Sequence, residues 1–131
     1  QLNQIEWGTD FETAAAKAES NQKTILITFS GSDWCKPCIL LHQKLYDTAE
    51  FGIYASENLE LVKADFPSSK KNQLSKVQTA KNEALAAKYN PDGVFPLAIF
   101  VSPAGKVLGT FGYDKAKTPE DYITAFKQYI K

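Results

Sequence analysis

The chain has 131 residues, of which 44% are hydrophobic and 23% are charged. This is enough apolar material for one folded domain over residues 1–131, with a core that needs no disulfide support. Fifteen basic side chains balance fifteen acidic ones, so the composition gives no reason to expect binding to nucleic acid or to an anionic membrane surface.

Hydropathy along the chain bears on membranes and export. No apolar run approaches the roughly 18 to 20 residues that a membrane-spanning helix needs, so we expect no stable membrane insertion. The N-terminus lacks the basic-then-apolar pattern of a signal peptide. The sequence contains no methionine and starts at Gln1, which is consistent with removal of an export signal or with a trimmed fragment.

The N-terminal third begins with a helix and a strand. "TDFETAAAKAESN" predicts a helix that ends near Asn21 and that starts with a capping box formed by Thr9 and Glu12. "TILITF", residues 24–29, is short, β-branched and almost wholly apolar. This composition is typical of a strand that is buried on both faces of a sheet.

A second helix is expected to begin at the two cysteines and to run through Leu40, Leu41 and Leu45. It should break around residues 46–48, before another helical piece over residues 49–57. "LELVKADF", residues 59–66, alternates apolar and polar positions as a strand does.

A polar stretch from Pro67 leads into a predicted helix of about twenty residues. "NPDG", residues 90–93, should end this helix, because Pro and Gly both break helices. The positions expected to face inward are Leu74, Val77, Leu85 and Tyr89.

The C-terminal part predicts a hairpin and a last helix. "VFPLAIFV", residues 94–101, is followed by the turn "SPAG" and by "KVLGTFGY". Thr118 as N-cap and Pro119 at the first helical position start the helix. Its expected inward side chains are Tyr122, Ile123, Phe126 and Ile130. The order βαβαββα, after a strand or loop around Trp7, predicts an α/β fold with a mixed central sheet and helices on both faces.

Cys35 and Cys38 are the only cysteines. As a structural crosslink they would close so short a loop that the stabilisation is on the order of 2 kcal/mol. A zinc site generally needs four ligands, and the sole histidine, His42, would bring the number to three; we expect His42 to be a solvated helix residue. Haem attachment is excluded, because Ile39 stands where that motif needs histidine.

A redox dithiol explains the neighbouring residues. Cys35 lies at the first turn of the predicted helix, where free backbone N–H groups and the helix dipole favour thiolate, so we expect it to be the attacking nucleophile. Cys38 is nearly one turn further on the same side, more deeply covered, and should be the resolving thiol. Pro37 restricts the backbone in the first turn and holds the two sulfurs in register.

The charges around the dithiol suggest its direction of reaction. The helix dipole contributes at most about 2 kcal/mol, and the charge of an exposed Lys36 is screened by solvent and salt. We therefore expect the pKa of the Cys35 thiol to be only modestly lowered. The prediction is a reducing or near-neutral dithiol that attacks substrate disulfides through a mixed disulfide.

With "WCKPC" between a buried strand and a helix, and with "GSDWC" and "VFPLAIFVSPAGKVLG", the whole chain resembles the thioredoxin superfamily. It is most similar to the thioredoxin-like domains of exported bacterial proteins related to periplasmic disulfide reductases and isomerases. The resemblance implies the thioredoxin fold and a thiol:disulfide oxidoreductase without a cofactor or a metal. It also implies disulfide-containing protein substrates, an unidentified redox partner, a monomer, and an extracytoplasmic location, with the cytoplasm as the alternative.

The resemblance also implies a substrate site. Pro96 should be a cis-proline opposite the dithiol, which would bring the backbone of Phe95 toward the sulfurs, so that an extended substrate could pair with it. Trp34 would form one wall of a shallow groove. Lys36 and Pro37 would complete the substrate-binding set.

Two positions depart from the family pattern. Typical thioredoxins place a buried aspartate in the strand before the dithiol, where this chain has Thr28; proton transfer from the resolving cysteine must then use water or another group. Leu97 follows Pro96 where many relatives have threonine. The polar insertion and helix over residues 67–89 could in addition shape a surface for a partner.

Two other functions compete with catalysis. The chain could be a non-catalytic interaction module that keeps the fold and uses the groove for docking. A metal carrier that uses the two cysteines and His42 is the third hypothesis.

Overall fold

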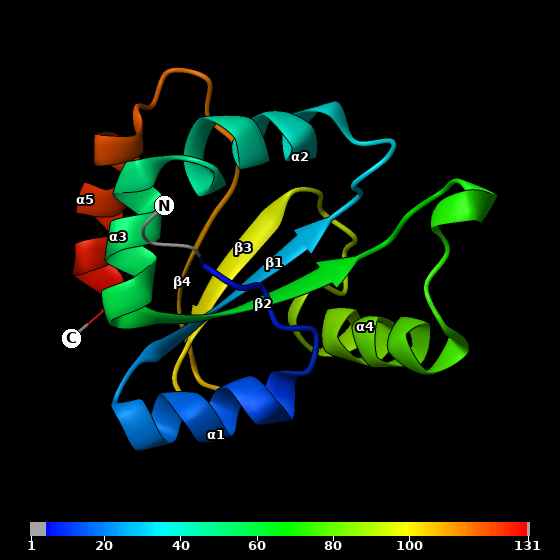
Figure 1. Ribbon diagram of the computed structural model, residues 1–131, viewed down its shortest axis with the longest axis horizontal. Helices are drawn as coiled ribbons and strands as arrows, with labels where there is room; N and C mark the ends of the chain where they lie inside the picture. The colour runs from blue at the N-terminus through cyan, green and yellow to red at the C-terminus, as the bar shows by residue number, and fades with distance from the viewer. Residues whose placement is uncertain (1–4, 131) are drawn as a thin grey trace.

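In the computed structural model, which describes residues 5–130, a four-stranded sheet lies between two layers of helices (Figure 1). A π-helical turn, η1, continues α2, and η2 is a single 3₁₀ turn. The elements in chain order are α1 (Phe11–Asn21), β1 (Thr24–Ser30), α2 (Lys36–Leu41), η1 (His42–Tyr46), α3 (Ala49–Asn58), β2 (Leu59–Asp65), η2 (Lys70–Asn72), α4 (Lys76–Tyr89), β3 (Leu97–Val101), β4 (Val107–Phe111) and α5 (Pro119–Tyr129).

The sheet is mixed, as the sequence predicts. Its strand order is β2-β1-β3-β4. β1 pairs parallel with β2 and antiparallel with β3, and β3 and β4 form the predicted antiparallel hairpin. The segment around Trp7 adds a short parallel bridge between Gly8 and Val62 at the edge of β2.

Two hydrophobic cores lie on opposite faces of the sheet. β1 is buried along its whole length, and its alternate side chains enter alternate cores because successive residues of a strand point to opposite faces. Leu26 joins the core under η1, α3 and α5, whereas Ile25 and Ile27 join the core under α1 and α4. The prediction of a sheet covered by helices on both faces is therefore confirmed.

The last helix follows its prediction closely. Thr118 is the N-cap, Pro119 is the first helical residue, and Asp121 completes a capping box with Thr118. Tyr122 and Phe126 are buried in the core. Ile123 and Ile130 pack against that core from its edge.

The start of α1 differs from its prediction. Asp10, rather than Thr9, is the N-cap, and its carboxylate accepts a hydrogen bond of 3.0 Å from the backbone N–H of Thr13. The predicted capping box of Thr9 and Glu12 is therefore wrong by one residue. Both residues are good caps in isolation; the backbone bridge at Gly8 places the chain so that the helix starts one residue later.

Replacing Asp10 with alanine should lower the free energy of unfolding by about 1 kcal/mol, because the N-terminal N–H groups lose their acceptor. Thr9→Ala, the matched control, should change it by less than about 0.5 kcal/mol. Hydrogen bonds from Thr13, then Lys81, lower the pKa of Asp10 to about 2. Its contribution is thus complete above the ordinary aspartate pKa and is lost as pH falls through about 2. Urea unfolding of both variants checks this; equal losses would contradict the assignment of the cap.

The segment after β2 is also organised differently from its prediction. α4 has 14 residues, and Leu74 lies before it. Val77 is 67% exposed, so its predicted inward position is wrong. Asn82 is the buried residue of this helix, and its side-chain amide donates to the carbonyl oxygen of Asp65. The hydrophobic pattern misses this contact because a hydrogen bond to the end of β2 helps to orient the helix.

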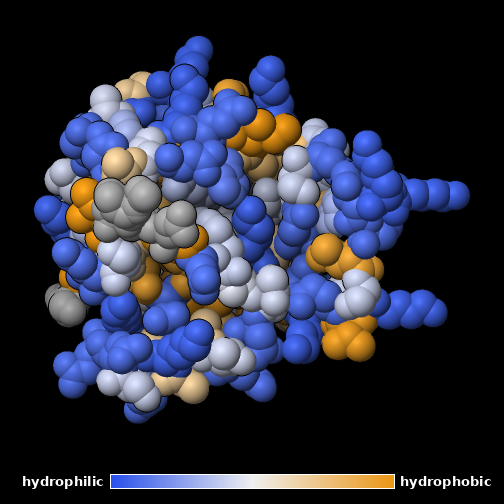
Figure 2. Space-filling view, in the orientation of Figure 1, coloured by the Kyte–Doolittle hydropathy of each residue, from blue (hydrophilic) through white to orange (hydrophobic). Residues whose placement is uncertain are grey.

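The surface is mostly hydrophilic on the face that Figure 2 shows, with small and separate hydrophobic patches. Trp34, at 50% exposed, is one of the large hydrophobic side chains that solvent reaches. Among residues 5–130, no helix has both the length and the hydropathy needed to cross a bilayer.

Candidate active site

The dithiol lies where β1 passes into α2, beyond the carboxyl end of the strand (Figure 1). Cys35 is the N-cap of α2, and its sulfur accepts a hydrogen bond of 3.3 Å from the backbone N–H of Cys38. The two cysteines form a disulfide, with their Cα atoms 5.2 Å apart. The predicted placement of the pair within bonding distance is confirmed.

The surroundings of the two sulfurs differ more than their coverage. Cys35 is 5% exposed and Cys38 is 4% exposed. The two cysteines are thus buried to nearly the same extent, whereas Cys38 was expected to be clearly more buried. The sulfur of Cys38 accepts a hydrogen bond from the backbone N–H of Gly31, and Cys38 borders a partly open pocket. Lys36 and Pro37, which separate the cysteines, are both exposed at the start of α2.

An aromatic cluster borders the dithiol loop. Trp34 is half exposed, and its ring centre lies 5.5 Å from that of Phe95 in an edge-to-face arrangement. Phe66 also packs edge to face with Phe95, at 5.6 Å between ring centres. The indole N–H of Trp34 donates a hydrogen bond of 2.7 Å to the carbonyl oxygen of Phe66. This contact holds the exposed ring in one orientation.

The predicted cis-proline is confirmed. The peptide bond between Phe95 and Pro96 is cis, and Pro96 directly precedes Leu97, which pairs with Phe29 near the end of β1. The cis bond therefore lies at the same end of the sheet as the dithiol loop. The structure thus brings Trp34 and Phe95 together and places Pro96 beside them at this end of the sheet.

Two aspartates that the sequence interpretation did not single out tie the dithiol loop to the end of β2 and to the segment that follows it. Asp65 accepts hydrogen bonds from the backbone N–H and the hydroxyl of Ser32. Asp33 accepts from the side chain of Asn72 and from the backbone N–H groups of Ser68 and Ser69. These hydrogen bonds lower the pKa of Asp33 below its ordinary value. The polar insertion is therefore attached to the loop that carries the cysteines.

Thr28 occupies the position where typical family members carry an acid. It is buried, and its hydroxyl oxygen accepts a hydrogen bond of 3.1 Å from the hydroxyl of Tyr46. Burial raises the pKa of Tyr46, so this phenol stays protonated at neutral pH. The pair is neutral and cannot act as a carboxylate base.

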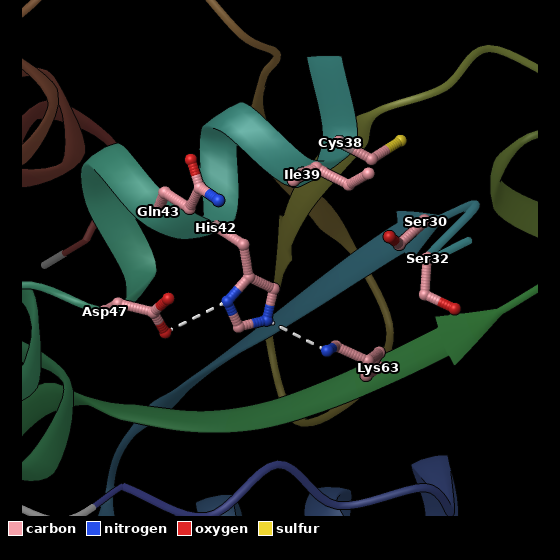
Figure 3. Close-up of a pocket in the computed structure, with 8 residues that line it drawn as sticks. All are labelled: Ser30, Ser32, Cys38, Ile39, His42, Gln43, Asp47 and Lys63. Atoms are coloured by element: carbon pink, nitrogen blue, oxygen red, sulfur yellow. Dashed lines mark hydrogen bonds and ion pairs between the residues drawn. The ribbon is translucent and has the colours of Figure 1, made fainter. Parts of the chain in front are cut away.

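His42 is not the solvated helix residue that the sequence interpretation expected. Its side chain is only 29% exposed, and its Nδ1 lies 3.1 Å from Oδ1 of Asp47. Its Nε2 lies 2.9 Å from Nζ of Lys63, which comes from β2 (Figure 3). The spacing of four residues between Cys38 and His42 predicts that they share a helical face. No local sequence pattern predicts the contact of His42 with Lys63.

A metal centre is not formed by these groups. Within residues 5–130, the structure brings together no set of three or more histidine, cysteine, aspartate or glutamate side chains that could hold a metal ion. The metal-carrier hypothesis has no geometric support in that part of the chain.

Comparison with known proteins places these features in a family. The model of the family described as thioredoxin-like matches residues 6–103. The chain belongs to the thioredoxin-like family. It is 33% identical over 127 residues to the disulfide bond reductase DsbH of Chlamydia pneumoniae, across 97% of this chain and 74% of that protein.

Solved structures agree with the thioredoxin-like assignment. The structure of a DsbH oxidoreductase matches with a TM-score of 0.85 and 30% identity, over 95% of this chain and 83% of that one. A thioredoxin from Thermus thermophilus matches with a TM-score of 0.66 and 16% identity, over 95% of this chain and 85% of its own. The second match shows the likeness of fold alone.

Proposed function

We propose that the chain is a thiol:disulfide oxidoreductase that reduces or isomerises protein disulfides, with Cys35 as nucleophile and Cys38 as resolving thiol. The main observation behind this proposal is the disulfide-bonded pair of cysteines at the start of α2. The similarity to a relative named a disulfide bond reductase supports the same activity.

The reaction runs in two displacements. The Cys35 thiolate attacks one sulfur of the substrate disulfide; a bond forms between them, the substrate bond breaks, and the first substrate thiolate leaves. The Cys38 thiol then loses its proton, and its thiolate attacks the Cys35 sulfur. The ring disulfide forms and the second substrate thiolate leaves. Two electrons pass from the dithiol to the substrate.

The N–H of Cys38, which donates to the Cys35 sulfur, supports the role of Cys35. A donor of this kind stabilises thiolate more than thiol, so a larger fraction of Cys35 is in the attacking thiolate form at neutral pH, and Cys35 is a better leaving group than a free cysteine. The donor from Gly31 does the same for Cys38 once the ring opens. Both donors belong to the backbone, so neither depends on the rotamer of a side chain.

The substrate lies across Trp34 and Phe95, in our proposal, with the backbone before Pro96 available to an extended chain. Support comes from the exposed indole, fixed by its hydrogen bond to Phe66, and from its contact with Phe95. A rigid aromatic surface binds apolar side chains at low entropic cost. Lys36 and Pro37 lie exposed next to the sulfurs and would touch the substrate on either side of its disulfide.

Partners and location follow from this activity. The substrates would be disulfide-containing proteins, and a separate redox partner must return the ring disulfide to the dithiol. The likeness to exported bacterial thioredoxin-like domains supports an extracytoplasmic location, because protein disulfides form and persist there. The cytoplasm is the alternative.

The test uses the reduced protein and insulin. We expect one mole of reduced chain to reduce about one mole of insulin disulfide, seen as precipitation of the freed chain, because each ring carries two electrons. Protein whose cysteines have been alkylated is the control and should be inactive. Equal activity of both samples would favour the docking module over the enzyme.

The direction of the reaction is tested by the reduction potential. Equilibration with glutathione buffers should give a value nearer to about −270 mV, that of a thioredoxin-like reductant, than to about −120 mV, that of a strong oxidant. A value at the oxidising end would overturn the reductase direction and leave oxidoreductase chemistry in place.

A further inference from the structure

A cavity of about 300 Å³ lies behind Cys38, between η1 and the carboxyl ends of β1 and β2 (Figure 3). Cys38 and Ser30 border it at one end, and His42, Asp47 and Lys63 border it at the other. The volume suits several water molecules, which can hydrogen-bond to the polar atoms at either end. The resolving cysteine therefore borders a pocket that also contains charged side chains, although the strand position that usually carries an acid holds Thr28.

Three side chains in this cavity form one hydrogen-bonded chain. Lys63 can only donate, so the Nε2 of His42, 2.9 Å from Nζ, must accept. The proton of a neutral imidazole is then on Nδ1, which donates to the Asp47 carboxylate at 3.1 Å. Asp47 thus selects the tautomer of His42, and that tautomer holds the end of Lys63 inside the cavity.

Within this hydrogen-bonded set, Lys63 rather than His42 is the positively charged side chain. Burial, and then the charge of Lys63, lower the pKa of His42 below its ordinary value, so the imidazole is neutral at neutral pH. Burial also lowers the pKa of Lys63, while Asp65 and Asp47 raise it. The remaining titratable neighbour, Tyr46, stays protonated because burial raises its pKa.

We propose that Asp47 and His42 are positioning residues that hold the Lys63 ammonium in the cavity behind Cys38, and that this cation replaces the missing acid by favouring the thiolate form of the resolving cysteine. The inference rests on the proposed function and deepens it. The Cys38 thiol gives its proton to water in the pocket, the thiolate forms beside the pocket that Lys63 also lines, and it then attacks the Cys35 sulfur and closes the ring. A cation close to a thiol favours ionisation without accepting the proton itself.

The two displacements can be timed separately. Reduced protein is mixed with one equivalent of a chromogenic aromatic disulfide, dithiobis-nitrobenzoate, in a stopped-flow instrument. Attack by Cys35 releases the first coloured thiolate, and ring closure by Cys38 releases the second. The rate of the second phase is measured against pH for the wild type and for His42→Leu, Lys63→Met, His42→Gln and Gln43→Ala.

Loss of the positioned cation should slow ring closure and leave the first attack unchanged. In His42→Leu and Lys63→Met we expect the second phase at pH 7 to be about three- to tenfold slower, with its pH profile displaced to higher pH. His42→Gln keeps an oxygen that can accept from Lys63 and should restore most of the rate. Gln43→Ala, on the same turn and the same cavity wall, should match the wild type.

Different results separate the two proposals. A second phase with the wild-type pH profile in both His42→Leu and Lys63→Met would overturn the positioned cation and leave the proposed function intact. A wild-type first phase no faster than that of glutathione would overturn the proposed function, and this inference with it. Circular dichroism would detect misfolding of His42→Leu. In that case Lys63→Met still tests the proposal, because it removes the cation by a different substitution.

Discussion

Cys35→Ser should abolish insulin reduction, whereas Cys38→Ser should keep the first displacement and stop at the mixed disulfide. The two cysteines are nearly equally covered, so accessibility alone does not assign these roles. The assignment rests on position: Cys35 caps the helix and receives the Cys38 N–H. Loss of the nucleophile should lower multiple-turnover activity roughly 1,000-fold or more.

The measurement combines insulin turnover with mass spectrometry of the reaction mixture. Cys38→Ser should accumulate a covalent adduct with the substrate, which a reductant releases, and Cys35→Ser should form none. Each variant is the control for the other, because both lose the same ring disulfide and one sulfur atom. An adduct that forms through Cys38 in Cys35→Ser, with none in Cys38→Ser, would reverse the two roles.

The fold was predictable because its signals are local and agree with one another. The apolar run at residues 24–29, the Pro-Gly turn at 90–93 and the cap at Thr118 each specify one element without reference to the rest of the chain. Their order then restricts the architecture to a mixed sheet covered on both sides. The cap of α1 was missed by one residue because Thr9 and Asp10 are both strong caps, and a tertiary contact decides between them.

The candidate site was predictable in part. The spacing of Cys35 and Cys38 gives the dithiol directly, and the family resemblance gives the cis bond at Pro96, since few X-Pro bonds are cis. The environment of His42 was not predictable. Its partner Lys63 is 21 residues away, on a strand, and no local pattern records that pairing.

The same limit applies to the loop that carries the dithiol. Asp33 binds backbone groups about 35 residues later in the chain, so the sequence shows a polar insertion without showing what it contacts. Val77 illustrates the opposite error, an apolar residue that periodicity placed inward and that is exposed. Hydrogen bonds between distant polar groups, which hydrophobic periodicity does not register, account for the missed contacts of Asp33 and His42.

Phe126→Ala should lower the free energy of unfolding by about 3 to 5 kcal/mol, the usual cost of removing a fully buried aromatic ring. Phe126 is 1% exposed. Its ring centre lies 4.9 Å from that of Phe100 on β3 and 4.8 Å from that of Phe111 on β4. Removal of the ring leaves a cavity between α5 and the sheet, which neighbouring aromatic rings are too rigid to fill. Ile53→Ala, at a position that is 46% exposed on α3, is the control and should cost under about 1 kcal/mol.

This variant also tests whether the chain is one domain. The thioredoxin-like family match ends at residue 103, whereas β4 and α5 follow it and complete the core that contains Leu26 and Phe100. If that core is continuous, Phe126→Ala should shift a single transition in urea, with tyrosine fluorescence and thiol reactivity changing together. Loss of α5 at lower urea than the rest, with the dithiol still protected, would instead mean that the last helix is an appendage. Such a result would confine the cooperative unit to the strands and helices around the cysteines.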